Sequence, residues 1–237
     1  MSALSLDDFH GHWLPGFAFC NLAYQFFEQV KQGPDGVNRL RMRASETEKR
    51  LVEELLPICQ FIQASARPGR NIEIQWLNGD QSHDGNYRQY GSLVIRGMTP
   101  AEGQLEVTTV VHPNDFLARE TLAKGNPVFG VEGLTRSADR SIQSIPSIRT
   151  NMEFVDAFHA HVAKVLEKKA SKGYQQGTIL IMQLSLDVLY QEDEWQHLVG
   201  RVRSSLPPHP FAEIFLCEDL YLHRASILIE SPRGPWR

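Results

Sequence analysis

The sequence predicts a mixed α/β fold, in which an antiparallel three-strand meander and a parallel fourth strand form a central sheet flanked by helices. Two segments begin with a capping box and continue with apolar residues at helical spacing, so both are predicted to be helices. Three short strand-like segments lie between them, joined by short loops. A continuous apolar run follows the second helix, and such a run is typical of a strand buried on both faces.

The first of these helices is predicted to begin at Ser45 and to end near residues 67–69. Ser45 and Glu48 have the spacing of a capping box, in which each side chain satisfies a backbone N–H of the other residue. Pro57 lacks a backbone donor, so we expect it to bend the helix. Apolar residues recur on one face of this segment at Leu51, Leu55, Ile58 and Ile62.

The meander is predicted from three consecutive segments. Residues 71–77 alternate apolar and polar side chains, residues 90–96 include Leu93-Val94-Ile95, and residues 104–112 form the third strand. A polar loop over 78–86 joins the first two strands. Short connections of this kind favour antiparallel pairing.

The second half of the chain supplies the crossover. Residues 135–149 are rich in Ser and Arg and are expected to form a surface loop. Thr150 and Glu153 form the second capping box and begin the most regular helix of the chain. The buried strand is predicted over 178–184, and the last two elements are a helix at 192–205 and a strand at 211–217. We expect residues 1–237 to form a single domain.

Composition narrows the class of protein. The 237 residues carry a net charge of −4, which argues against a protein wrapped in nucleic acid over its whole surface. Three scattered cysteines form no CxxC pair, so a structural zinc site is not expected and a reducing, cytoplasmic compartment is. No segment has the length of a membrane span, and the first residues do not resemble a signal peptide. The motifs of zinc proteases, P-loop proteins and α/β-hydrolases are absent.

The order of elements over about residues 45–185 resembles the core of the PD-(D/E)xK nuclease superfamily, which has a restriction-endonuclease-like fold. This resemblance implies a core at about 45–185 with N-terminal and C-terminal additions. It implies divalent-metal-dependent hydrolysis of phosphodiesters, with Mg²⁺ or Mn²⁺ as cofactor. In that superfamily an Asp near the second strand and a Glu inside the third hold the metal, and a Lys two residues after the Glu helps to place the attacking water.

Glu106 matches the family's Glu, because it lies between Leu105 and Val107 in the third predicted strand. A carboxylate in an apolar strand is costly unless it is paired or binds a metal, and a salt-bridged Glu is the alternative. The family's Lys position holds Thr108. At about 100° per residue, Lys169 alone of the nearby lysines falls within the apolar face of the second helix. Lys169 is therefore the candidate catalytic lysine, with a solvent-directed side chain as the alternative.

The resemblance assigns the remaining metal ligands to acids in two places. Asp84 is preferred to Asp80 for the family's Asp because it lies nearer the second strand, although Asp84-Gly85-Asn86 is equally a turn sequence. Glu54 on the first helix is a further candidate metal ligand, and pairing with an Arg is the alternative. Basic residues that could meet nucleic-acid phosphates are Arg136, Arg140, Arg149, Lys168 and Lys172; a solvated charged face is the alternative.

These observations leave two functional hypotheses. The first is a metal-dependent nuclease in which Asp84, Glu106 and Lys169 act on a nucleic acid. The second is a nuclease-like fold that has lost catalysis and binds a protein partner or helps an assembly, because two of the three family positions are irregular here. A coincidental order of elements in another α/β fold is the third reading. Neither hypothesis involves a membrane.

Overall fold

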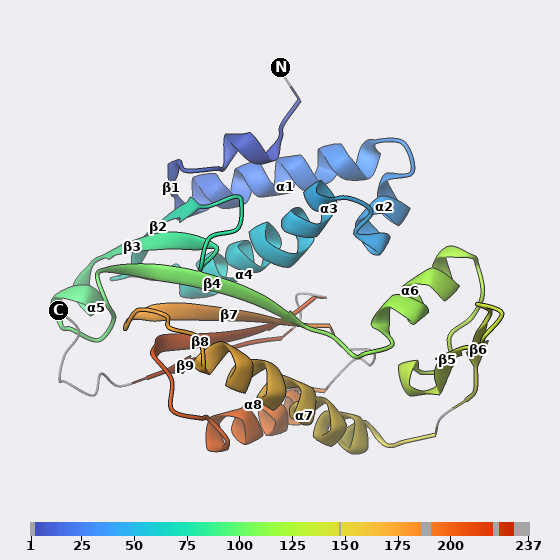
Figure 1. Cartoon of the computed structure of the whole chain (residues 1–237). Helices are drawn as coiled ribbons and strands as arrows, with labels where there is room; N and C mark the ends of the chain where they lie inside the picture. The colour runs from blue at the N-terminus through green and yellow to red at the C-terminus, as the bar shows by residue number, and fades with distance from the viewer. Residues whose placement is uncertain (1–2, 147, 186–190, 220–222, 230–237) are drawn as a thin grey trace.

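The computed structural model describes residues 3–146, 148–185, 191–219 and 223–229. Within these ranges a seven-stranded sheet lies between two layers of helices (Figure 1). Its strands follow the order β1 (Trp13–Pro15), β2 (Asn71–Trp76), β3 (Gly85–Tyr90), β4 (Glu102–Val110), β7 (Thr178–Leu184), β8 (Phe211–Glu218) and β9 (Arg224–Leu228).

The sheet is mixed, as the sequence predicts. The pairs β1–β2, β2–β3 and β3–β4 are antiparallel, and β9 is antiparallel to β8. The pairs β4–β7 and β7–β8 are parallel. A parallel pair needs a crossover connection, and the helix α7 (Asn151–Ala170) lies in the connection from β4 to β7.

Helices cover both faces of the sheet. The first face carries α1 (Gly16–Gln32) and α4 (Leu56–Ser65), and the second carries α7 and α8 (Glu192–Ser204) (Figure 1). The shorter helical elements are η1 (Leu6–Asp8), α2 (Gly36–Met42), α3 (Glu46–Arg50), η2 (Leu51–Leu55), α5 (Ser92–Ile95), α6 (Asp115–Ala123) and η3 (Val131–Gly133). Among the described helices, none combines the length and apolar character that crossing a membrane requires.

The alternation of side chains along β4 and β7 divides the core into two clusters. Leu105 and Val107 pack with Ile179 and Ile181 in the cluster under α1 and α4. Leu180, which lies between these two isoleucines, packs in the cluster with α7 and α8. This arrangement explains the continuous apolar run at 178–184, since a strand covered by helices on both faces has no solvent-facing position.

The helical segment that begins after Ser45 is continuous to Ser65 but changes its winding just before its proline. Ser45 and Glu48 form the expected capping box at the start of α3. The turn η2 is a π-helix, and Pro57 lies in the first turn of α4 directly after it. Proline cannot donate to the carbonyl four residues earlier and its ring clashes with that group, so the wider turn accommodates it.

The second strand of the meander lies earlier than the sequence indicates. It is β3, and the segment 92–95, which we expected to be part of a strand over 90–96, forms the short helix α5. The buried positions of β3 include Tyr87 and Gln89, whose polar atoms are bonded inside the protein. Because these buried residues are polar, an apolar–polar alternation does not mark the strand.

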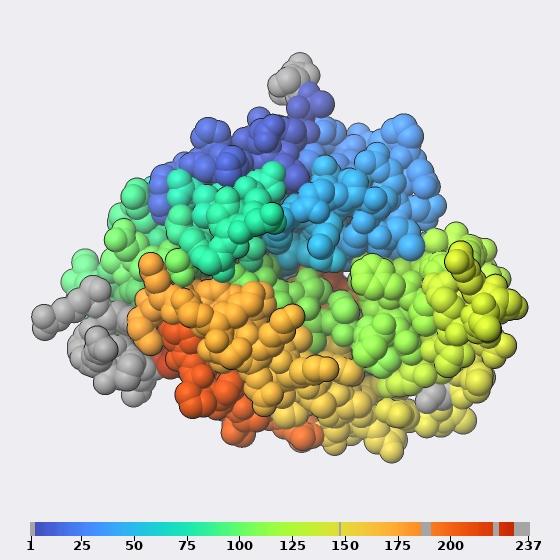
Figure 2. All heavy atoms as spheres, in the orientation of Figure 1, coloured from blue at the N-terminus to red at the C-terminus, as the bar shows by residue number. Residues whose placement is uncertain are grey.

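The segment 135–149 also differs from the surface loop that we expected. It contains most of a two-stranded antiparallel sheet formed by β5 (Leu134–Arg136) and β6 (Ile142–Ser144). With α6 it forms a lobe beside α2, and Arg119 of α6 donates to the Arg41 carbonyl at 3.2 Å. Figure 2 shows a hollow between this green and yellow lobe and the blue segment that carries α2 and α3.

A buried ion pair joins the meander to β8. Arg70 and Glu213 are each 2% exposed, and Nη2 of the arginine lies 2.7 Å from Oε2 of the glutamate. Arg70 Nε donates to Gln89, and Glu213 Oε1 accepts from Ser226. The charges are thus paired and hydrogen-bonded, which is the condition under which proteins retain buried ions.

Candidate functional site

The centre of the candidate site is a contact between Glu106 of β4 and Lys169 of α7. The Lys169 ammonium donates to Oε1 of the Glu106 carboxylate. Glu106 is 4% exposed, and the Lys169 side chain is mostly buried. Leu105 and Val107 point to the face under α1 and α4, so Glu106 between them points to the face that carries α7.

The position of Lys169 follows from how α7 begins and packs. Thr150 accepts from the Glu153 backbone N–H, which fixes the start of the helix. Val162 and Leu166 are buried against the sheet, and Lys169 continues their face one turn later. Lys168 and Lys164 are exposed. Lys169 therefore leans toward Glu106 as its helical position predicts, rather than toward solvent.

Asp84 lies directly beside this pair. It immediately precedes β3, and its backbone N–H donates to the Leu105 carbonyl at 3.0 Å. Its Oδ2 accepts a hydrogen bond of 2.7 Å from the backbone N–H of Val107. Because β3 begins at Gly85, Asp84 lies at the start of the second meander strand, and not upstream of a strand that begins at 90 as the sequence predicts.

The electrostatic environment of Asp84 is unusual for an aspartate. Burial and the nearby carboxyls of Glu106 and Glu54 raise the pKa of Asp84 to about 7. The hydrogen bond from Val107 and the charge of Lys169 act in the opposite direction. A strongly perturbed acid beside a second acid and a lysine is a feature of functional sites.

Tyr174 is a member of this group that the sequence analysis missed. It lies between α7 and β7, and its hydroxyl oxygen is buried. Burial and the carboxyls of Glu106 and Asp84 raise the pKa of Tyr174. No sequence motif marks Tyr174. It lies in the connection from α7 to β7, and this connection brings it near the carboxyls of Glu106 and Asp84.

Glu54 lies in the π turn η2 and is mostly buried. Its Oε2 accepts from the Trp76 indole at 3.0 Å, and its Oε1 pairs with Arg50. Burial raises the pKa of Glu54. Pairing with an arginine, the alternative weighed for this residue, is thus present, and both carboxylate oxygens already have protein partners.

The carboxylate oxygens of Asp84 and Glu106 fit a divalent cation whose remaining ligands come from the substrate and from water. Among the described residues, no group of three or more His, Cys, Asp or Glu side chains is arranged to hold a metal ion. Asp84 and Glu106 are two carboxylates, however, and the hydrogen bond from Val107 engages only Oδ2 of Asp84. Mg²⁺ typically uses one or two carboxylates and completes its octahedron with water and phosphate oxygens.

The basic residues divide between the two ends of α7, which spans about 30 Å. Lys168 and Lys172 lie at the end that carries Lys169. Arg149 precedes the opposite end and pairs with Glu132 at 3.4 Å. Arg136 of β5 pairs with Glu120, and Arg140 occupies a left-handed turn in the same lobe. The structure therefore gathers the lysines near Glu106 and leaves the three arginines away from it.

The arrangement combines two adjacent carboxyls, a lysine and a buried tyrosine hydroxyl, and this set can hold a cation, position a water molecule and stabilise negative charge. Comparisons of this chain with protein-family models, with curated proteins and with solved structures find no match.

Proposed function

We propose that the protein is a divalent-metal-dependent nuclease of the PD-(D/E)xK type, with its centre at Asp84, Glu106 and Lys169. The single observation that carries this proposal is the convergence of these side chains from the start of β3, the middle of β4 and the end of α7. Each comes from a different element, and none is close to the others in sequence.

Each side chain has a distinct task in this proposal. Asp84 and Glu106 would hold Mg²⁺ or Mn²⁺ with their carboxylate oxygens. Lys169 stays within reach of the site because Glu106 anchors its ammonium, where it orients the attacking water and stabilises charge on the phosphate oxygens. The bound metal supplies Lewis acidity and lowers the pKa of a coordinated water.

In this proposal Glu54 does not bind the metal itself and instead influences Asp84 through its charge. Its oxygens are held by Arg50 and Trp76, yet its charge contributes to the raised pKa of Asp84. It thereby increases the affinity of Asp84 for either a proton or a cation.

The substrate phosphates would approach from the end of α7 that carries Lys168 and Lys172. Both lysines are exposed, and exposed cations near a metal site position a phosphate backbone without reading sequence. The arginines Arg136, Arg140 and Arg149 would contact only nucleic acid long enough to follow α7 along its length.

The test compares Glu106→Gln with Glu102→Gln. Both residues lie on β4 and differ by four positions, but the Glu102 side chain is 77% exposed. Wild type and Glu102→Gln should cleave DNA or RNA with Mg²⁺ or Mn²⁺, and Mn²⁺ should raise their melting temperature. Glu106→Gln should lose both the cleavage and the Mn²⁺ effect. Cleavage by Glu106→Gln would overturn the assignment.

A second candidate function is a non-catalytic binding or assembly module. The observation that favours it is that, among the described residues, no three His, Cys, Asp or Glu side chains are arranged to hold a metal ion. In that case Lys169 serves as the permanent partner of Glu106, and wild type shows neither cleavage nor a Mn²⁺-dependent change in melting temperature.

A further inference from the structure

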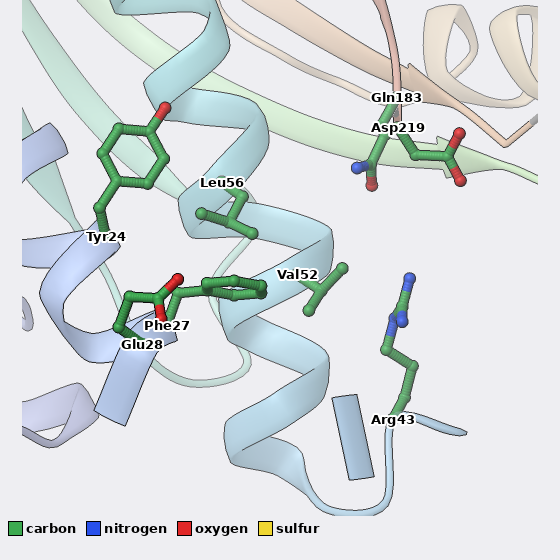
Figure 3. A pocket seen from close by; sticks show the side chains of 8 residues that line it. All are labelled: Tyr24, Phe27, Glu28, Arg43, Val52, Leu56, Gln183 and Asp219. Atoms are coloured by element: carbon green, nitrogen blue, oxygen red, sulfur yellow. The ribbon is translucent and has the colours of Figure 1, made fainter. Parts of the chain in front are cut away.

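A pocket of about 510 Å³ lies at the carboxyl ends of β7 and β8. It is lined by residues of α1, η2, α4 and β7, by Arg43 directly after α2 and by Asp219 directly after β8 (Figure 3). Its volume falls in the range of small-molecule sites, about 300–1,000 Å³. Open α/β sheets bind ligands outside the carboxyl ends of their parallel strands, so the place in the fold also suits a ligand.

The pocket is separate from the proposed nuclease centre. Gln183 of β7 pairs in register with Thr109 of β4 and with Cys217 of β8. Cys217 belongs to the cluster under α1 and α4. Gln183 shares that face, whereas Glu106 points to the opposite face, toward α7.

One end of the pocket is polar, and two of its acceptor oxygens have no hydrogen-bond partner among the described residues. Gln183 is 3% exposed, and its Oε1 has no hydrogen-bond partner in the described part of the chain. Asp219, directly after β8, accepts from the Ser185 hydroxyl through Oδ2, while its Oδ1 has no such partner. Buried acceptors of this kind are costly, and a ligand with N–H donors would satisfy them.

The charges around this end favour a neutral ligand. Arg43 lines the same pocket, and Figure 3 shows its side chain directed toward Gln183 and Asp219. Burial and the neighbouring Arg119 lower the pKa of Arg43 to about 10. Arg43 also lies 3.5 Å from Glu53. A cationic ligand group would meet the arginine, and an anionic one would meet the carboxyl of Asp219.

The rest of the pocket is apolar and aromatic. Phe27 and Leu56 form its middle between the polar end and Tyr24 (Figure 3). Glu28 at the other end is exposed and pairs with Lys31 at 3.1 Å. A flat ring fits between such walls, and a polar substituent on the ring would lie toward the exposed end.

We propose that this pocket binds a nucleobase with an amide-type edge, that is, a neutral heterocycle in which a ring N–H stands next to a carbonyl, as in guanine and uracil. In guanine the ring N–H and the exocyclic amino group donate to Gln183 Oε1 and Asp219 Oδ1, and in uracil the single ring N–H donates to one of these two oxygens. The ring carbonyl accepts from Arg43 or from the Gln183 amide. The ring lies against Phe27 and Leu56, and the ribose of a nucleoside faces the exposed end.

The experiment titrates guanosine, uridine and adenosine into the full-length protein by calorimetry. Adenosine is the matched control, because its base has no ring N–H next to a carbonyl. Guanosine or uridine should bind at least about tenfold more tightly than adenosine, since an unpaired buried acceptor costs about that factor. Equal binding of all three, or no binding of any, would overturn the proposal.

Three variants test whether Gln183 contacts the ligand or is merely a buried glutamine. Gln183→Met preserves volume and should weaken guanosine or uridine binding at least about tenfold without lowering the melting temperature. Gln25→Met, at an exposed position of α1, should bind as wild type does. Glu106→Gln should also bind normally, because it lies on the other face. Unchanged binding in Gln183→Met would refute the assignment.

Discussion

The carboxylate of Asp84 accepts a hydrogen bond of 2.7 Å from the backbone N–H of Val107, the residue that follows Glu106. This bond ties the start of β3 to the middle of β4 and holds two acids next to each other. Two carboxyls held next to each other repel when both are charged, and this lowers the free energy of unfolding, as is common at functional sites. The effects on stability and on its pH dependence can be measured with single substitutions.

Asp84 should make the protein less stable as pH rises. Its folded-state pKa, about 7, lies above the ordinary aspartate range, so the folded state keeps a proton that the unfolded state loses. The associated stability is present at about pH 4 and is lost as pH rises through 7. Asp84→Asn keeps an acceptor for Val107 and should be more stable than wild type at about pH 8, on the order of 2–4 kcal/mol.

Urea unfolding of both proteins at about pH 5 and about pH 8 measures this difference. The gain from Asp84→Asn should be small at the lower pH and large at the higher one. A gain that is the same at both pH values would contradict a raised pKa for Asp84.

Lys169→Met should be destabilising, and more so at high pH. The lysine charge lowers the pKa of Asp84, so its removal raises that pKa further and leaves Glu106 without its cation. We expect a loss of about 2–4 kcal/mol at about pH 8. The exposed neighbour Lys168→Met is the control and should change stability by less than about 0.5 kcal/mol. Equal effects of the two variants would show that the Glu106 contact contributes nothing.

Glu213→Gln should strongly destabilise the fold. It leaves the Arg70 guanidinium buried without its counter-charge, and breaking a buried pair in this way costs about 3–5 kcal/mol. The matched control is Glu28→Gln, which breaks an exposed pair with Lys31 and should cost less than about 1 kcal/mol. Chemical unfolding midpoints of the two variants give the comparison, and a loss in Glu213→Gln no larger than in the control would contradict the burial of the pair.

Thr150→Ala should lower the free energy of unfolding by about 1 kcal/mol, because it removes the oxygen that accepts from the Glu153 N–H at the start of α7. Thr150→Ser keeps that oxygen and should restore most of the loss. Thermal melts of the three proteins are sufficient to compare them. A serine variant as unstable as the alanine variant would point to lost packing of the threonine methyl instead.

The sequence predicted the parts of the fold in which local signals agree with the tertiary structure. The capping boxes at Ser45 and Thr150 lie where α3 and α7 begin. The start of α7 and its apolar face together fixed the direction of Lys169, so its contact with Glu106 could be anticipated before the structure. The mixed sheet followed from the order of elements and from the apolar run of β7.

The sequence could not predict features that depend on distant partners. Gln89 is buried because Arg70 and the Pro100 carbonyl bond its amide, so β3 lacks an apolar pattern and its start was misplaced. Asp84 was selected although its strand was placed too late. Tyr174 joined the site only through the path of the crossover connection, and β1, with three residues, is too short to give a periodic signal.

The Arg70–Glu213 pair also bears on how the chain is made. The two residues are separated by 143 positions, so a ribosome that has released the whole meander has not yet supplied the carboxylate that Arg70 requires. Until β8 emerges, the guanidinium must stay in water, and the layer under α4 cannot close. The N-terminal half is therefore expected to wait as an open intermediate during synthesis and to complete its core only when the last strands arrive.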